Sequence, residues 1–255
     1  MKNYFDLSGR VALVTGGSSG LGVQFAKALA NQGADIALCA RRMEKLEAVK
    51  KEVEAMGVKC FIHKCDVTCS QEITETVNAV LEHYGKIDIL VNNAGLGLAE
   101  PAESQSDETW ETMINTNLNG VYYFAREVGR SMKEKGYGRI INIGSIHSSV
   151  AMPFTPLTAY NTTKGAVAIL TKSLANEWAK TGITVNAIGP AYFASEMTQD
   201  VLAGEGFQKV VEAYCPMGRP GQAGELDGAL IYFAAETSSY TTGQLLTIDG
   251  GWTTI

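Results

Sequence analysis

The chain has 255 residues, of which 45% are hydrophobic and 19% are charged, and its formal net charge is −6. This composition is typical of an ordinary soluble globule with a sizeable core. The acidic balance and the lack of any basic run argue against a nucleic-acid partner, because such partners require clustered Lys and Arg. No stretch offers the roughly 20 apolar residues that cross a membrane, and residues 1–6 lack the apolar run of a signal peptide. We therefore expect a cytoplasmic protein.

Strands and helices alternate along the whole chain. Val- and Ile-rich runs predict strands at about 10–15, 35–40, 58–64, 87–92, 139–144, 183–188 and 244–248. Helical patterns fill about 20–32, 43–56, 70–84, 107–135, 159–180 and 222–235. Near-continuous hydrophobic strands suit a parallel sheet that is covered on both faces. The sequence predicts an α/β fold, with one doubly wound domain over 1–255. We expect a seven-stranded parallel sheet with helices on both faces. A helical insert at about 190–218 would carry the substrate loop.

The first predicted strand runs into Thr15-Gly16-Gly17-Ser18-Ser19-Gly20-Leu21-Gly22 and then into a helix. Glycines at such a junction allow a tight turn and let a pyrophosphate approach the helix N-terminus, whose free N–H groups favour an anion. After the first strand of a βαβ unit, this pattern indicates a dinucleotide site.

The end of the second strand discriminates between the two nicotinamide dinucleotides. An Asp or Glu there binds the adenosine ribose hydroxyl, whereas Arg accommodates a 2′-phosphate. The chain has Ala40-Arg41-Arg42 and no carboxylate at this point. Two guanidinium groups can bind a phosphate, so we favour NADP(H) over NAD(H). The alternative is that the arginines pair with Glu44 and Glu47 at the start of the next helix.

Other strand ends carry polar residues that would line the same crevice. Asp66-Val67 follows the third strand, and Asn92-Asn93-Ala94-Gly95 follows the fourth. Asp66 could accept from an adenine amino group, and the Asn-Asn-Ala-Gly turn keeps side chains small where a ribose would pass.

Five cysteines occur without CxxC spacing, namely Cys39, Cys60, Cys65, Cys69 and Cys215. His63 lies among three of them, but a strand at 58–64 would direct Cys60 and Cys65 to opposite faces. We expect reduced thiols and no metal site.

Tyr160 and Lys164 are four residues apart on a predicted helix and therefore share one face of it. An ordinary tyrosine has a pKa near ~10, and a neighbouring ammonium group would lower it. Ser145 closes the fifth strand just before this helix and could hold a substrate carbonyl beside the tyrosine. Asn117 is unusual in a long helix, where it could support a water molecule or a local kink or could simply be exposed.

Together, these motifs resemble the short-chain dehydrogenase/reductase family along essentially the whole chain. The resemblance rests on TGGSSGLG (15–22), Asp66, NNAG (92–95), Asn117, Ser145, YNTTK (160–164) and IGP (188–190). It implies a Rossmann domain in which Tyr160 is the general acid/base and Lys164 binds the nicotinamide ribose. It further implies that Ser145 orients the substrate oxygen and that Asn117 holds a water in a proton relay. A homotetramer or homodimer built through the long helices is also implied.

The predicted cofactor-binding residues are Gly16, Ser18, Ser19, Gly20, Leu21, Arg41, Arg42, Asp66, Val67, Asn93, Ala94, Gly95, Tyr160, Lys164 and Pro190. The predicted substrate-binding residues are Ser145, His147, Tyr160 and Tyr192. Three features depart from the family pattern: the Ser145–Tyr160 segment is two residues longer, Pro190 is followed by Ala191 instead of Gly, and Ser18-Ser19 replaces a basic residue of many NADP-dependent members.

The expected pocket walls are mostly apolar or aromatic, namely Leu96, Leu98, His147, Phe154, Tyr192, Phe193 and Met197. We therefore expect NADP(H)-linked interconversion of a ketone and a secondary alcohol on a bulky apolar substrate of hydroxysteroid or bile-acid type. The segment 189–198 resembles gluconate 5-dehydrogenases and 3-oxoacyl-carrier-protein reductases, so an NAD(H)-linked gluconate-type enzyme or a 3-oxoacyl reductase is the alternative. A non-catalytic dinucleotide-binding module is the alternative from another class.

Overall fold

A computed structural model of the chain describes residues 3–153, 155–195, 198, 202 and 204–254. Its centre is a seven-stranded parallel sheet with the strand order β3-β2-β1-β4-β5-β6-β7. The strands are β1 (Val11–Thr15), β2 (Asp35–Ala40), β3 (Cys60–Lys64), β4 (Ile89–Asn92), β5 (Gly138–Ile143), β6 (Ile183–Pro190) and β7 (Leu245–Ile248). This topology confirms the predicted doubly wound α/β fold.

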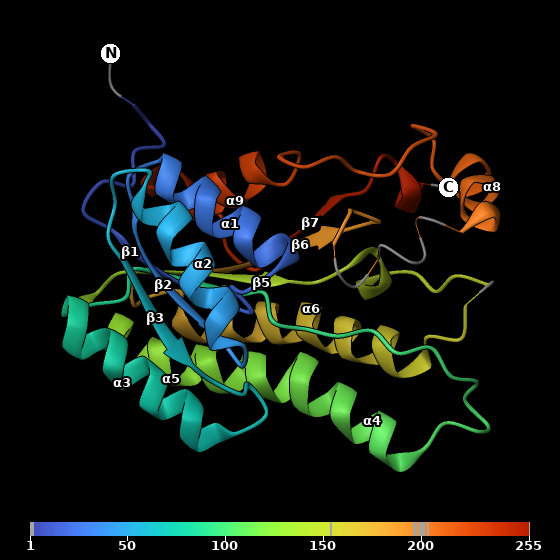
Figure 1. Ribbon diagram of the computed structural model, residues 1–255, viewed down its shortest axis with the longest axis horizontal. Helices are drawn as coiled ribbons and strands as arrows, with labels where there is room; N and C mark the ends of the chain where they lie inside the picture. The colour runs from blue at the N-terminus through green and yellow to red at the C-terminus, as the bar shows by residue number, and fades with distance from the viewer. Residues whose placement is uncertain (1–2, 154, 196–197, 199–201, 203, 255) are drawn as a thin grey trace.

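Helices cover both faces of the sheet (Figure 1). One layer contains α1 (Gly20–Asn31), α2 (Met43–Glu54) and α9 (Asp227–Ala234). The other contains α3 (Ser70–Tyr84), α4 (Asp107–Ile114), α5 (Gly120–Lys135) and α6 (Thr158–Trp178). A further helix, α8 (Glu205–Tyr214), lies at one end of the molecule, in the segment where we expected an insert. Among the described residues, no helix has both the length and the apolar character needed to cross a bilayer.

Two buried clusters attach these layers to the sheet. Alternate residues of β1 show the division, because Ala12 and Val14 pack with Phe25 of α1, whereas Val11 and Leu13 pack with the α3, α5 and α6 side. The cysteines follow the same rule: Cys60 belongs to the first cluster and Cys65 to the second. All five cysteines are free thiols.

The helix expected at 107–135 is interrupted. A π-helical turn, η1 (Asn115–Asn119), separates α4 from α5. Such turns occur where a side chain is required in a direction that a regular helix does not provide. Asn117 lies in this turn and only 1% of it is exposed, so it is not an exposed polar position.

Strand order decides where a ligand can bind. The chain leaves β1 toward β2 on one side, and β4 lies on the other side of β1. Helical connections therefore diverge at the carboxyl ends of β1 and β4, which opens a crevice at this point in doubly wound sheets. The glycine loop follows β1, and Asn93 follows β4.

Gly129 of α5 allows close approach to α6, because a Cβ atom there would lie 2.8 Å from Cη2 of Trp178. We expect Gly129→Ala to lower the free energy of unfolding by about 1–3 kcal/mol through overpacking. A Cβ atom at Gly228 of α9 would have no atom within 4 Å. Gly228→Ala should therefore raise the free energy of unfolding by about 0.5–1 kcal/mol. Urea denaturation measures the free energy of unfolding of both variants. A change of the same sign in both would contradict the difference in packing between Gly129 and Gly228.

Candidate active site

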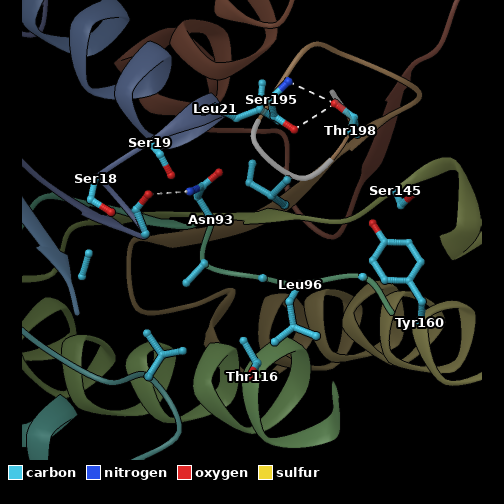
Figure 2. Close-up of a pocket in the computed structure, with 18 of the residues that line it drawn as sticks. Ser18, Ser19, Leu21, Asn93, Leu96, Thr116, Ser145, Tyr160, Ser195 and Thr198 are labelled. Carbon is cyan, nitrogen blue, oxygen red and sulfur yellow. Dashed lines mark hydrogen bonds between the residues drawn. The ribbon is translucent and has the colours of Figure 1, made fainter. Parts of the chain in front are cut away.

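A cavity of about 790 Å³ opens at the carboxyl ends of the strands. Figure 2 shows Ser18 and Ser19 toward one end of it, and Ser145 and Tyr160 at the other. All fifteen predicted cofactor-binding residues line it: Gly16, Ser18, Ser19, Gly20, Leu21, Arg41, Arg42, Asp66, Val67, Asn93, Ala94, Gly95, Tyr160, Lys164 and Pro190. Residues from the ends of six strands, β1 to β6, are thus brought to one space.

The glycine loop is held tightly against the turn after β4. Gly16 has φ +65°, and a Cβ there would lie 2.9 Å from the Cα of Ala94. A Cβ at Gly22 would collide with the carbonyl oxygen of Gly16. Asn93 Nδ2 donates to the carbonyl oxygen of Thr15 at 2.9 Å, so this side chain supports the loop. The glycines therefore leave a cradle that larger residues would fill.

Arg42 and the two serines of the loop form a polar group at the same end. Arg42 Nη2 donates to Ser19 Oγ at 2.8 Å and to Ser18 Oγ at 3.4 Å. Ser19 is the N-cap of α1, yet its side chain caps none of the backbone N–H groups of that helix. Uncapped N–H groups at the start of a helix favour an anion such as a phosphate.

Hydrogen bonds from Thr68, two residues along the chain, orient the Asp66 carboxylate. Partial burial would raise the pKa of its carboxyl, but hydrogen bonds from the N–H and the hydroxyl of Thr68, together with the charge of Arg41, hold that pKa below its usual value. Asp66 is thus an anionic acceptor at the cavity wall.

Tyr160 directs its hydroxyl into the cavity toward Ser145 (Figure 2). Ser145 accepts a hydrogen bond from the backbone N–H of His147 at 3.2 Å. The His147 ring packs edge-on against Tyr160 with 5.7 Å between the ring centroids, and its Nδ1 lies 3.3 Å from the Val150 carbonyl oxygen. Because a carbonyl only accepts, Nδ1 carries the hydrogen, and burial lowers the pKa of His147 so that the ring is neutral at pH 7.

Lys164 is buried, with 6% of its surface exposed. Its Nζ donates to the carbonyl oxygen of Ile143 at 2.8 Å and lies 5.6 Å from the centroid of the Tyr160 ring. Burial lowers the pKa of Lys164 to about 8. The ammonium form therefore still predominates at pH 7.

The expected direction of the Tyr160 pKa is wrong for this structure. Burial raises the pKa of Tyr160, and the hydrogen bond with Ser145 only partly offsets this effect. The ammonium group of Lys164 binds a carbonyl instead of the phenol oxygen, so desolvation of the phenolate dominates. Tyr160 is consequently a protonated phenol at pH 7.

Asn117 acts on the backbone around the site. Its Oδ1 accepts from the N–H of Leu96 at 2.9 Å, and its Nδ2 donates to the Leu96 carbonyl at 2.8 Å. The same Nδ2 donates to Thr163 Oγ1 at 3.2 Å, and Thr163 in turn donates to the carbonyl oxygen of Tyr160 at 2.8 Å. Asn117 thereby joins the turn after β4 to the helix that carries Tyr160.

Two predicted substrate-binding residues lie outside the set that lines the cavity. The His147 ring packs edge-on against Tyr160. Tyr192 lines a neighbouring cavity of about 470 Å³ with Trp252 and packs against Phe207. Phe193 lines both cavities, whereas Tyr192 lines the neighbouring one and not the main one. Leu98 is 41% exposed, and Phe154 and Met197 lie outside the described residues.

Several lining residues escaped the sequence analysis, namely Thr112, Asn115, Thr116, Ser195 and Thr198. The first three lie on α4 and η1, where the expectation of one regular helix gave no reason to single them out. Ser195 and Thr198 form a local turn in which the Ser195 N–H donates to Thr198 Oγ1 at 3.0 Å. A Ser-x-x-Thr spacing offered the one available signal.

Burial of Lys164 predicts a pH-dependent stability. Its pKa falls from about 10.4 in the unfolded chain to about 8 in the folded protein. Between these values the unfolded chain binds more protons, so the free energy of unfolding should rise with pH. We expect wild type to gain stability relative to Lys164→Met between pH 7 and 10 in urea titrations. Parallel pH curves for the two proteins would contradict the prediction.

Comparisons with known proteins indicate the same class of protein as the geometry of the cavity does. The family model described as short chain dehydrogenase matches residues 10–206. The chain is similar to gluconate 5-dehydrogenase of Gluconobacter oxydans, with 41% identity over 98% of this chain and 97% of that protein. It is also similar to 2-dehydro-3-deoxy-D-gluconate 5-dehydrogenase of Bacillus subtilis, with 39% identity over 99% of this chain and 98% of that protein.

A solved gluconate 5-dehydrogenase from Burkholderia cenocepacia, in complex with NADP and tartrate, superposes with a TM-score of 0.95 and 35% identity. The match covers 99% of this chain and 98% of that chain. The chain therefore belongs to the short-chain dehydrogenase/reductase family and is an oxidoreductase that acts on CH–OH groups.

Proposed function

We propose that the protein is an NADP(H)-dependent oxidoreductase that interconverts a ketone and a secondary alcohol on an open-chain polyhydroxylated compound of the gluconate type. One observation carries the proposal: Ser145, Tyr160 and Lys164 share a single cavity with the glycine loop. A non-catalytic dinucleotide-binding module has no need for a half-buried phenol beside a buried hydroxyl and a buried amine at the far end of its nucleotide site.

The residues of the cavity fit a nicotinamide dinucleotide. The glycine cradle and the first turn of α1 suit a pyrophosphate, and Asp66 suits a hydrogen-bond donor on the adenine. Arg41 and Arg42 suit a 2′-phosphate, which favours NADP(H) over NAD(H). Lys164 has a buried ammonium group with one carbonyl partner among the described residues, which leaves donors for ribose hydroxyls.

When bound, the nicotinamide supplies the hydride. Tyr160 donates a proton to the carbonyl oxygen during reduction and accepts it back during oxidation. Its raised pKa keeps the proton on the phenol at neutral pH, which suits the reductive direction. Ser145 accepts backbone N–H groups, so its own hydrogen is directed to the substrate oxygen or the phenol.

The relatives and the polarity of the cavity support the substrate class. Both curated relatives bear names of sugar-acid dehydrogenases. Of the aromatic residues that suggested an apolar substrate, Phe193 lines the cavity, whereas Tyr192 belongs to the neighbouring one. Among the described residues at the Ser145 end, Lys164 is the one cation that lines the cavity. Hydroxyl groups of the substrate, more than its carboxylate, should therefore carry recognition.

We also propose that residues 1–255 form a single cytoplasmic domain that assembles as a homodimer or homotetramer. The exposed apolar residues Trp110, Tyr122 and Ile169 on α4, α5 and α6 support assembly through the long helices. Residues 190–218 would then form the substrate loop insert.

We expect Tyr160→Phe to lower kcat by about 10²–10⁴-fold, because the substituted ring has no proton to transfer. NADPH affinity, measured by fluorescence titration, should stay within about threefold, since the ring itself remains. Tyr240→Phe is the control, because Tyr240 is fully exposed. Substantial turnover by Tyr160→Phe would refute the role of the phenol.

The substrate for that assay comes from a panel of sugar acids, alditols, ketoses and hydroxysteroids, each followed by nicotinamide absorbance with both cofactors. A sugar acid or a neutral polyol should be turned over fastest. Fastest turnover of a hydroxysteroid would instead support the apolar substrate expected from the wall residues. No turnover of any compound would favour the non-catalytic module.

Arg41→Ala should weaken NADPH binding by about 10–100-fold and change NADH binding by less than about threefold, because the second nucleotide has no 2′-phosphate. Isothermal titration with both nucleotides measures the difference. Arg130→Ala on α5, whose guanidinium group is exposed, is the matched control. Equal weakening of both nucleotides would contradict the phosphate contact.

A further inference from the structure

One hydroxyl group lies between the two elements that carry the site. Ser148 is the last residue of the short 3₁₀ helix η2 (Ile146–Ser148), which follows β5. Its Oγ donates to the carbonyl oxygen of Lys164 at 2.9 Å and accepts from the N–H of Ser145 at 3.2 Å. Ser148 thus bridges the backbones of two proposed site residues from different elements.

The bridge also fixes the Ser145 side chain. Ser145 is the N-cap of η2 and forms a reciprocal capping box with Ser148, in which each side chain accepts from the backbone N–H of the other. Ser145 Oγ also accepts from the N–H of His147. A hydroxyl has one hydrogen and two lone pairs. With backbone donors on its lone pairs, Ser145 can act only as a donor toward the cavity.

The Ser148 side chain is closely packed on both sides. A Cβ atom at Gly144 would lie 3.0 Å from Ser148 Oγ, so the hydroxyl is packed against the end of β5. On its other side, the Lys164 carbonyl belongs to the turn of α6 that begins at Tyr160. That turn is tied to η1 as well, through Thr163 and Asn117. The turn is therefore held from both directions by hydroxyl groups.

We propose that Ser148 is a positioning residue that holds Ser145 and the Tyr160–Lys164 turn in the relative geometry that proton transfer requires. The inference rests on the proposed function, since it assumes those three roles. Ser148 touches neither substrate nor cofactor in this scheme and is not among the described residues that line the cavity. It acts through the two backbone groups that it binds.

Three variants test the proposal with the fastest substrate of the panel. Ser148→Ala removes both hydrogen bonds and should lower kcat by about 10–100-fold, since small misplacements at a site cost up to ~10² in rate. KM and the NADPH dissociation constant should stay within about threefold. Ser148→Thr keeps the hydroxyl and should restore kcat to within about threefold of wild type. Ser149→Ala, at the exposed neighbouring position, should behave as wild type.

Two results would overturn the proposal. One is an unchanged kcat in Ser148→Ala. The other is a loss of kcat in Ser148→Ala that Ser148→Thr, with a native thermal midpoint, does not restore. Should Ser148→Thr fail to fold, hydrogen exchange decides: the Ser145 amide must exchange faster in Ser148→Ala than in wild type, and equal rates overturn the bridge. Tyr160→Phe is measured in parallel. If it stays active, the proposed function fails; if it is inactive while Ser148→Ala is fully active, only this inference fails.

Discussion

The site depends on a buried ammonium group at the end of a β-strand. Lys164 reaches from α6 to the carbonyl of Ile143, where β5 ends, and its charge is removed from water. Such burial is unfavourable, as the lowered pKa of Lys164 indicates. A group kept charged at that cost restricts where α6 can lie relative to the sheet. The rest of the site, including Tyr160 one turn earlier, follows from that restriction.

The same burial explains why the tyrosine is not acidic here. A cation lowers the pKa of a phenol only if its field exceeds the loss of hydration, and in this protein the ammonium group is directed at a carbonyl 2.8 Å away. Desolvation consequently dominates at Tyr160. A phenol that retains its proton, beside a serine whose lone pairs are already used, suits the proton donor that we propose Tyr160 to be. The pKa shifts of Lys164 and Tyr160 are thus both consequences of desolvation.

The sheet, the glycine loop and the set of residues that line the cavity were predictable from the sequence, because each depends on local rules of periodicity, backbone freedom and strand ends. The π-helical turn around Asn117 was not, since no local pattern distinguishes a π turn from an α-helix with a poor helix former. The sequence also did not indicate that Tyr192 lines the neighbouring cavity, because the direction of this side chain depends on the path of the chain after β6 and on packing against Trp252. The pKa of Tyr160 could not be obtained from a spacing, because it depends on burial.

Hydroxyl groups hold this site more than ion pairs do. Thr163 and Ser148 each bind a backbone carbonyl of the Tyr160–Lys164 turn, at 2.8 Å and 2.9 Å. A charged group in either position would bias the protonation of both Tyr160 and Lys164, whereas a neutral hydroxyl fixes geometry without altering the charge balance. A site that must exchange a proton at neutral pH is better positioned by groups that do not titrate. The groups that position the Tyr160–Lys164 turn in this structure are accordingly an amide, Asn117, and two hydroxyls, Thr163 and Ser148.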